Sequence, residues 1–307
     1  MKKARSMLDG VFAPIPTPFD DNNEVARDRL THHIDRLMSH GVHGIVVLGS
    51  NGEAVHLSDA ERASIVANAR KALDEHHPLI AGTGSLSTWH AITLTITAAA
   101  EGANAALVLP PFYYRTQMTE QALLSHFRAV ADASPIPVLL YNMPRCTGID
   151  LPVDVVLALA EHERIWGMKD SGGDLAKLIS IRAGAPSSFR LLAGSAGYLL
   201  PALISGATGG IVALANLAPA ECVRLYRHAT EGDIDAATAL QTALTPLNTA
   251  VTSRWGVPGL KASLDLLGVY GGPVRPPLLP VGESQRKTLR TLLAQAGLSL
   301  TCERSRI

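Results

Sequence analysis

The chain has 307 residues, and its 27 lysines and arginines balance 27 aspartates and glutamates. This neutral balance, with no basic run in the body of the chain, gives no electrostatic basis for binding nucleic acid or an anionic membrane. Three widely spaced cysteines form neither a metal-ligand pair nor a disulfide framework, which favours a reducing cytoplasm: Cys146, Cys222 and Cys302.

Neither a signal peptide nor a membrane span is expected from the apolar segments. Residues 1–5 are basic, but Asp9 and the prolines that follow interrupt the apolar stretch before it reaches the length of a signal sequence. The Ala-rich segment 91–110 is broken by Glu101, Gly102 and Asn104, so it is too polar to cross a bilayer.

Short apolar runs alternate with helical patterns along most of the chain. The expected strands cover residues 11–15, 44–49, 79–82, 105–109, 136–141, 165–169, 190–193 and 210–214. Apolar residues spaced three and four apart predict helices between them, as in 28–38 and 88–101. Ser58 with Glu61 is the signature of a capping box at the start of another helix.

Eight such units, with no break in composition between them, predict an α/β fold of the closed (β/α)8 TIM-barrel class. We expect residues 1–215 to form the barrel that carries the active site. Leucines at helical spacing near 240–247, 264–267 and 289–293 predict additional C-terminal helices. Residues 216–307 would then be a helical extension packed on the barrel, in one structural unit with it.

Polar side chains follow several strands at the end where a barrel places its chemistry. Ser50 and Asn51 come after the second strand, Tyr113 after the fourth, Tyr141 ends the fifth and Lys169 ends the sixth. A lysine is unusual in a buried parallel strand, and desolvation favours the neutral, nucleophilic form of an amine. The plain alternatives are a lysine that snorkels to solvent and tyrosines that only pack.

Together, an amine and a phenol on adjacent strands have a chemical logic. The amine can attack a ketone, lose water and become a protonated imine, which accepts the electrons of a nearby breaking bond. The phenol can move the proton that this bond change requires. Backbone amides of the loop after the second strand, with the hydroxyl of Ser50, can hold a carboxylate.

Several separated motifs resemble the dihydrodipicolinate synthase and N-acetylneuraminate lyase superfamily: residues 49–53, 141–144, 167–172 and 192–195. The resemblance extends over nearly the whole chain. Within the superfamily the chain is most similar to 4-hydroxy-2-oxoglutarate aldolase, because of Ser50-Asn51 and the segments 111–115 and 168–173.

The resemblance implies a role for each matching residue. Lys169 would form the Schiff base with pyruvate or another 2-oxo acid, and Tyr141 would shuttle the proton. Ser50 and Asn51 would bind the carboxylate of the 2-oxo acid or relay protons. Tyr113 matches a tyrosine that reaches into the site of a neighbouring subunit.

The resemblance also implies that Ser171 and Ile211 line the pocket. The enzyme would be a homotetramer, built as a dimer of dimers, and would need neither a metal nor an organic cofactor. The implied reaction is a class I aldolase cleavage, in which 4-hydroxy-2-oxoglutarate or a similar acid gives pyruvate and an aldehyde such as glyoxylate.

One departure bears on the substrate. Cys146 stands where dihydrodipicolinate synthases have an arginine that grips the carboxylate of the second substrate, and Arg145 lies one position early. In an extended segment that shift would point Arg145 elsewhere. Arg145 and Arg115 are the nearby cations for a distal carboxylate. The synthases also carry Thr-Thr where this chain has Ser50-Asn51.

Three alternatives stay open on the sequence. The chain could be a 4-hydroxy-tetrahydrodipicolinate synthase, which joins pyruvate and aspartate semialdehyde. It could be another pyruvate-dependent sugar-acid aldolase or dehydratase. A non-catalytic barrel that senses a 2-oxo acid belongs to a different class. Adjacent histidines at 32–33 and 76–77 are expected to be surface residues rather than metal ligands.

Overall fold

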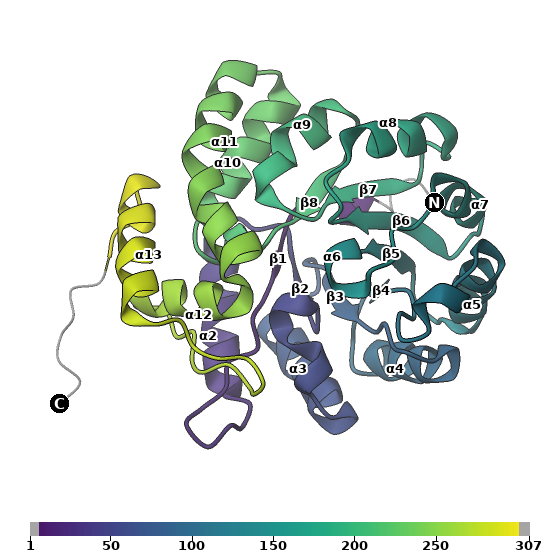
Figure 1. Ribbon diagram of the computed structural model, residues 1–307, viewed down its shortest axis with the longest axis horizontal. Helices are drawn as coiled ribbons and strands as arrows, with labels where there is room; N and C mark the ends of the chain where they lie inside the picture. The colour runs from purple at the N-terminus through teal and green to yellow at the C-terminus, as the bar shows by residue number, and fades with distance from the viewer. Residues whose placement is uncertain (1–5, 301–307) are drawn as a thin grey trace.

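The computed structural model describes residues 6–300, so the basic residues at 1–5 and Cys302 lie outside the described part of the chain. Eight parallel strands close into a barrel in the order of the sequence (Figure 1). They are β1 (Gly10–Pro14), β2 (Gly44–Val47), β3 (Leu79–Gly82), β4 (Ala105–Val108), β5 (Val138–Asn142), β6 (Ile165–Asp170), β7 (Arg190–Ala193) and β8 (Gly209–Ile211). The predicted fold class is confirmed.

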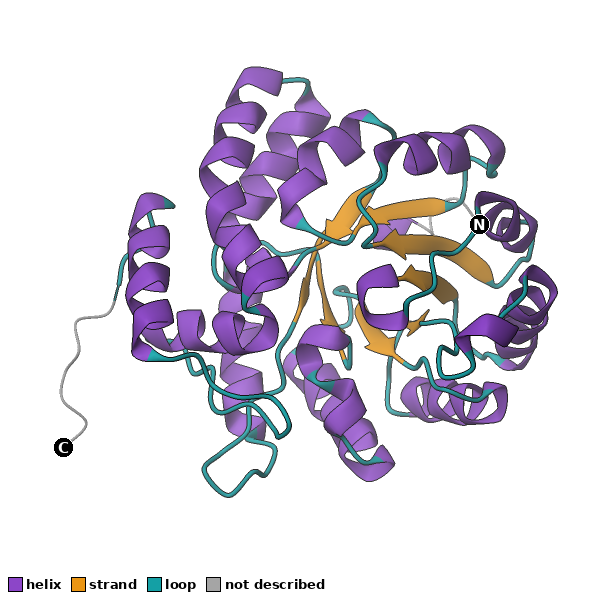
Figure 2. Cartoon of the chain, viewed as in Figure 1, coloured by secondary structure: helices purple, strands orange, loops and turns teal. Residues whose placement is uncertain are grey.

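Helices surround the barrel as its outer layer (Figure 2). Those that follow the strands are α2 (Arg27–Ser39), α3 (Asp59–Ala72), α4 (Thr88–Ala100), α5 (Glu120–Ala133), α7 (Val153–Ala160), α8 (Leu175–Gly184), α9 (Leu199–Ile204) and α10 (Pro219–Glu231). The capping box is present, since Glu61 N–H donates to Ser58 Oγ at 3.3 Å and Ser58 N–H donates to Glu61 at 2.8 Å. Within residues 6–300, no helix is long and apolar enough to cross a membrane.

Three more helices continue the chain after α10: α11 (Ile234–Thr249), α12 (Gly256–Leu266) and α13 (Glu283–Gln295). A π-helical turn, η7 (Ala250–Arg254), joins the first two. Leu244 and Leu247 of α11 and Leu289 and Leu293 of α13 are buried in the large cluster that also holds the outer side of β1 and β2. Figure 1 shows α13 at the outer edge of the molecule, next to α12.

The barrel interior is filled by large side chains from alternate strand positions. With Leu8, which precedes β1, they form one cluster: Phe12, Val46, Ile80, Leu107, Leu139, Tyr141, Leu192 and Ile211. Residues of the opposite parity, such as Leu140 and Met168, pack outward against the helices. This alternation decides which residues at a strand end face the barrel mouth and which face the helix layer.

The eighth strand is shorter than predicted. The chain turns after Ile211 into a 3-10 turn, η6 (Ala213–Asn216), where the sequence predicted strand to residue 214. Asn216 explains the turn, because its buried amide nitrogen donates to the carbonyls of Pro14 at 3.0 Å and Ala213 at 2.9 Å. These bonds curl the backbone against the end of β1.

The prediction that His33 is a surface residue is wrong. Its side chain is buried, and Nε2–H donates to Asn216 Oδ1 at 3.0 Å. Burial is the main reason that the pKa of His33 falls to about 4. His33 therefore packs as a neutral side chain that completes the hydrogen bonds of Asn216.

Candidate active site

Lys169 and Tyr141 meet inside the barrel mouth. The parallel register of β5 and β6 pairs these two residues, and both are buried, with exposed fractions of 4% and 3%. Lys169 Nζ donates to Tyr141 OH at 3.1 Å and lies 4.2 Å from the centroid of the ring. The lysine therefore does not snorkel to solvent, and the tyrosine does more than pack. A buried amine in reach of a phenol can form an imine and exchange protons.

Ser50 extends this pair to a third residue. Its Oγ shares a hydrogen bond of 3.3 Å with Tyr141 OH. Ser50 and Asn51 form the 3-10 turn η2 (Ser50–Gly52), directly after β2, and both are partly buried. The turn is closed by Gly52 N–H, which donates to Gly49 O at 3.0 Å. An amine, a phenol and a hydroxyl are thus joined by two hydrogen bonds that meet at Tyr141.

Two non-glycine residues in the left-handed region flank this turn. Leu48 has φ 58° and Glu53 has φ 51°, conformations that cost of order 1–3 kcal/mol each and persist only where surrounding contacts hold them. Glu53 is held by Lys261 Nζ of α12 at 2.6 Å and by the backbone N–H of Arg275 at 2.9 Å. The sequence showed Glu53 within a motif, but its partners come from the C-terminal extension and were missed.

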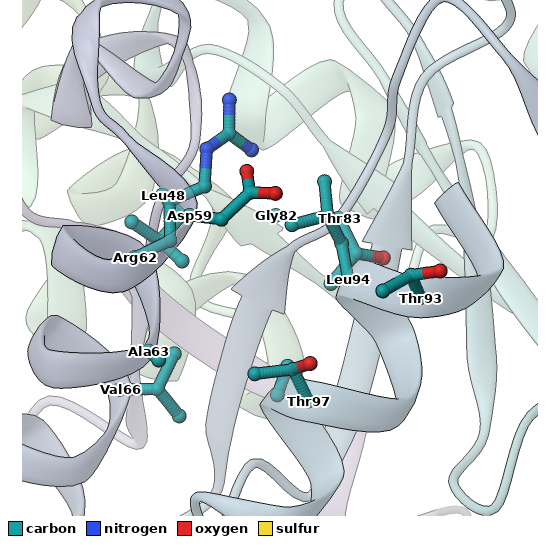
Figure 3. Close-up of a pocket in the computed structure, with 11 residues that line it drawn as sticks. Leu48, Asp59, Arg62, Ala63, Val66, Gly82, Thr83, Thr93, Leu94 and Thr97 are labelled. Atoms are coloured by element: carbon teal, nitrogen blue, oxygen red, sulfur yellow. The ribbon is translucent and has the colours of Figure 1, made fainter. Parts of the chain in front are cut away.

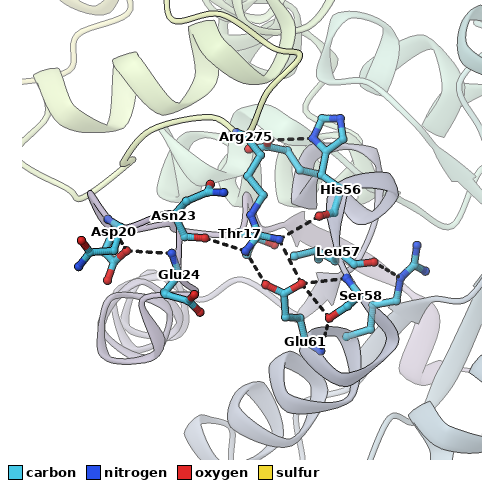
Figure 4. Close-up of polar contacts among 12 residues, drawn as sticks. Thr17, Asp20, Asn23, Glu24, His56, Leu57, Ser58, Glu61 and Arg275 are labelled. Carbon is cyan, nitrogen blue, oxygen red and sulfur yellow. Dashed lines mark hydrogen bonds and ion pairs between the residues drawn. The ribbon is translucent and has the colours of Figure 1, made fainter.

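Arg275 fastens the same extension to the start of α3 (Figure 4). Its guanidinium pairs with Glu61 and donates to the carbonyls of His56 at 2.9 Å and Asn23 at 2.8 Å. The hydrogen bond from Arg275 lowers the pKa of Glu61 to about 2. The C-terminal segment therefore helps to fix the loop that carries Ser50 and Asn51.

Tyr113 lies on the surface of the single chain. It is 73% exposed and packs edge-on against Tyr114, with 5.1 Å between the ring centroids. Among the described residues, its hydroxyl takes no part in the hydrogen bonds that join Ser50, Tyr141 and Lys169. One chain alone does not bring Tyr113 into that cluster.

Ser171 and Ile211 lie close to the Lys169 end of the barrel. Ile211 is fully buried and packs in the interior cluster with Tyr141. The Oγ of Ser171 is buried and has no hydrogen-bond partner among the described residues. Gly194 makes room for it, because a Cβ at position 194 would lie 2.0 Å from that oxygen. The hydroxyl of Ser171 therefore lies against Gly194 and makes no hydrogen bond to the described residues.

The segment after β5 is helical, so the expectation of an extended chain there is wrong. Residues Pro144–Thr147 form the short helix α6, which the proline begins and Gly148 ends at φ 66°. Arg145 donates to the carbonyls of Thr252, at 3.5 Å, and Ser253 of η7. Neighbouring side chains on a helical turn diverge, so Arg145 still cannot replace an arginine at position 146.

The two arginines offered for a distal carboxylate are both engaged in local packing. Arg145 ties α6 to η7 through its two carbonyl partners. The guanidinium of Arg115 packs against Gly148, where an added Cβ would lie 2.5 Å from Nη1. Cys146 is exposed on α6.

A small pocket lies beside the barrel rather than in its mouth (Figure 3). It has a volume of about 80 Å³ and lies between α3 and α4, among Asp59, Arg62, Thr83 and Thr97. Neither Lys169 nor Tyr141 lines it, so this pocket is separate from the candidate active site.

The fold and the site define a class: a (β/α)8 barrel with a buried lysine and tyrosine paired at the carboxyl ends of neighbouring strands. The chain belongs to the dihydrodipicolinate synthetase family, whose profile matches residues 7–296. It is a lyase of the aldolase type.

Relatives named for different activities match the chain over almost its whole length. It is 39% identical to a probable mitochondrial 4-hydroxy-2-oxoglutarate aldolase of Emericella nidulans over 297 residues, covering 95% of this chain and 96% of that one. It is 37% identical to a 4-hydroxy-tetrahydrodipicolinate synthase of Methanothrix thermoacetophila, covering 94% and 97%. It is 38% identical to an L-threo-3-deoxy-hexylosonate aldolase of Hypocrea jecorina, covering 89% and 91%.

Solved structures of the family have the same fold. One is YagE, a prophage protein of the family from E. coli K12, in complex with pyruvate. It superimposes with a TM-score of 0.90 at 30% identity, covering 95% of this chain and 99% of that one.

Proposed function

We propose that this protein is a Schiff-base (class I) aldolase that cleaves a 4-hydroxy-2-oxo acid, such as 4-hydroxy-2-oxoglutarate, to pyruvate and an aldehyde such as glyoxylate. The observation that carries the proposal is the 3.1 Å hydrogen bond from Lys169 Nζ to Tyr141 OH inside the barrel mouth. The chain's similarity to a probable 4-hydroxy-2-oxoglutarate aldolase and to an L-threo-3-deoxy-hexylosonate aldolase supports aldolase chemistry.

In the proposed reaction the neutral amine of Lys169 attacks the C2 carbonyl, and the adduct loses water to give a protonated imine. Tyr141 supplies the proton with which the adduct loses water, and the resulting tyrosinate takes the proton of the 4-hydroxyl group as the C3–C4 bond breaks. The electrons of that bond move into the imine, which becomes an enamine, and the aldehyde leaves. Tyr141 then gives its proton to C3 of the enamine. Hydrolysis of the protonated imine releases pyruvate, restores the amine of Lys169 and returns a proton to the tyrosinate.

The binding roles follow from where the remaining groups lie. Ser50 shares its hydrogen bond with the hydroxyl of Tyr141, so it can pass a proton to or from the phenol. Asn51 and the backbone amides of the same turn can hold the carboxylate of the 2-oxo acid. The free hydroxyl of Ser171 and the buried side chain of Ile211 would complete the pocket.

Cys146 favours the aldolase over the synthase. A hydrogen bond from an arginine to a carboxylate contributes about 1.5–3 kcal/mol, so its absence costs roughly ten- to a hundredfold in recognising aspartate semialdehyde. Arg145 does not compensate, because its guanidinium is bound to the carbonyls of η7. The synthase and the sugar-acid aldolase, both of which have relatives among the matches, are the competing functions.

Kinetics with a panel of substrates test this proposal. We expect a higher kcat/KM for cleavage of 4-hydroxy-2-oxoglutarate than for condensation of pyruvate with aspartate semialdehyde. Cys146→Arg is the matched variant, and it should improve the condensation more than the cleavage. A higher kcat/KM with aspartate semialdehyde in the native chain would assign the synthase. A higher kcat/KM with a longer sugar acid would assign the sugar-acid aldolase. If no substrate is turned over and borohydride traps no adduct at Lys169, the non-catalytic sensor would be favoured.

We also propose that the active unit contains at least two chains, in a homotetramer built as a dimer of dimers. The support is that Tyr113 and Tyr114 are 73% and 69% exposed on the single chain, outside the cluster to which the resemblance assigns Tyr113. Mixing Lys169→Ala chains with Tyr113→Ala chains tests whether Tyr113 of one chain completes the active site of its partner. About a quarter of the native activity should return, because half of randomly assorted dimers are mixed and each holds one complete site.

Sedimentation measurements complete the assembly experiment. The smallest active species should be a dimer. Full activity in a dilute, verified monomer, or no recovery when chains of both variants are refolded together, would refute the shared site.

The reducing cytoplasm inferred from the cysteine spacing stays a prediction.

A further inference from the structure

A second buried pair lies directly behind Tyr141 and Lys169. Asn142 and Asp170 follow these residues on β5 and β6, and the strand register pairs them in the same way. Because side chains alternate along a strand, this pair faces the helix layer while Tyr141 and Lys169 face the barrel mouth. Both side chains are almost completely buried, and Asn142 Nδ2 donates to Asp170 Oδ1 at 2.7 Å.

The side chain of Asn142 is fully used by the protein. Its nitrogen donates a second hydrogen bond to Asp150 Oδ1, also at 2.7 Å, and its oxygen accepts from the backbone N–H of Leu151 at 3.0 Å. Asp150 in turn forms an ion pair with Lys177 of α8. Burial raises the pKa of Asp150, but its bonds to Lys177 and Asn142 outweigh that effect and hold the pKa below its ordinary value.

Asp170 fixes the end of β6 from its own side. Its Oδ2 accepts from the backbone N–H of Gly173 at 3.0 Å, which closes the turn after the strand. Its carbonyl accepts from Gly194 N–H at 2.6 Å and from the hydroxyl of Tyr198 at 2.5 Å. Burial raises the pKa of Tyr198, so its hydroxyl stays protonated and keeps donating. The end of β6 is thus bound to β5, to its own turn and to the loop after β7.

We infer that Asn142 and Asp170 are positioning residues, which hold the backbone of β5 and β6 so that Tyr141 and Lys169 stay within proton-transfer distance. This inference rests on the proposed function. Asn142 directly follows Tyr141 in the chain, and Asp170 directly follows Lys169. A shift of the strands by about 1 Å is enough to cost a hundredfold in rate when two reacting groups must stay aligned.

Asn142→Ala is the first test. It removes three hydrogen bonds without touching Tyr141 or Lys169. We expect kcat and the rate of imine formation to fall by about ten- to a hundredfold, because misplaced reacting groups slow the chemistry. The KM should change much less, because the Ser50–Asn51 turn that would bind the substrate follows β2. At long times pyruvate and borohydride should still label one lysine per chain.

Asn216→Ala is the matched control. Asn216 is equally buried, donates two hydrogen bonds and accepts one, and lies at the ends of β1 and β8. It should lower the melting temperature by a similar amount and leave kcat nearly unchanged. Equal losses of kcat in Asn142→Ala and Asn216→Ala would show a merely structural role and overturn the inference.

Asp170→Asn tests the other member of the pair and carries the comparison if Asn142→Ala does not fold. It keeps the size of the side chain and can still accept from Asn142, but its amide nitrogen would face the N–H of Gly173. A smaller loss of kcat is expected, and restoring the carboxylate as Asp170→Glu should recover part of it. Native kcat in a folded Asp170→Asn chain would overturn the inference.

Borohydride trapping separates a failure of the proposed function from a failure of the positioning role. If the native chain forms no reducible adduct with pyruvate, the proposed function is wrong. If the native chain forms the adduct and Asn142→Ala forms it at the native rate, the proposed function stands and the positioning role is wrong.

Discussion

Replacing Lys169 with Ala should abolish the reduced pyruvyl adduct that we expect borohydride to trap in the native chain. It should lower kcat by several orders of magnitude, a scale typical of losing a catalytic nucleophile. No other amine could replace Lys169 as the nucleophile, because none of the described residues places another amine in hydrogen-bond contact with Tyr141. Mass spectrometry of the trapped chain locates the adduct, and steady-state kinetics measure the loss of turnover.

Two other lysines that are buried within residues 6–300 provide the control for this experiment. Lys177 is bound to Asp150, and Lys261 is bound to Glu53, so neither amine is free to attack a ketone. Lys177→Ala should therefore keep the adduct at position 169. An adduct that mapped to Lys177 or Lys261 in the native chain would show that the assignment of the nucleophile is wrong.

Tyr141→Phe should lower kcat by about a hundred- to ten-thousandfold, the contribution of a positioned acid or base. The ring, whose centroid lies 4.2 Å from Lys169 Nζ, would remain, but the hydroxyl that bonds Lys169 and Ser50 would be lost. Imine formation should slow less than cleavage, so the trapped adduct should still appear. Single-turnover kinetics separate these two steps.

Tyr270→Phe is the comparison for the loss of one tyrosine hydroxyl. The hydroxyl of Tyr270 donates to the carbonyl of Phe19 at 2.7 Å and takes no part in the hydrogen bond between Lys169 and Tyr141. This variant should lose about 1 kcal/mol of stability and almost no activity. If Tyr141→Phe kept more than about a tenth of the native kcat, the phenol would not be the principal proton carrier.

The family resemblance and the residue pattern together are enough to identify the pair Tyr141 and Lys169 from the sequence. Tyr141 and Lys169 end consecutive strands, and consecutive strands of a parallel barrel are neighbours, so chain order brings both to one mouth. Ser50 follows β2, which is not a neighbour of β5, but all strands end at the same mouth, and its hydroxyl lies 3.3 Å from that of Tyr141. The catalytic roles of these residues remain predictions.

Local patterns mislead where they compete with distant partners. The apolar run at residues 210–214 predicts a longer eighth strand, but Asn216 turns the chain by bonding to Pro14. The adjacent histidines on a helix predict a surface position for His33. Its partner, Asn216, lies 183 positions away in the sequence.

The sequence by itself determined the barrel, because the alternation of apolar strands with amphipathic helices is a local property that repeats along the chain. Only the tertiary structure decided how the site is held. The bond of Asn142 to Asp170 depends on the register of two strands. The bond of Glu53 to Arg275 spans 222 positions, and buried polar groups must find such partners wherever packing brings them, at distances that no local pattern encodes.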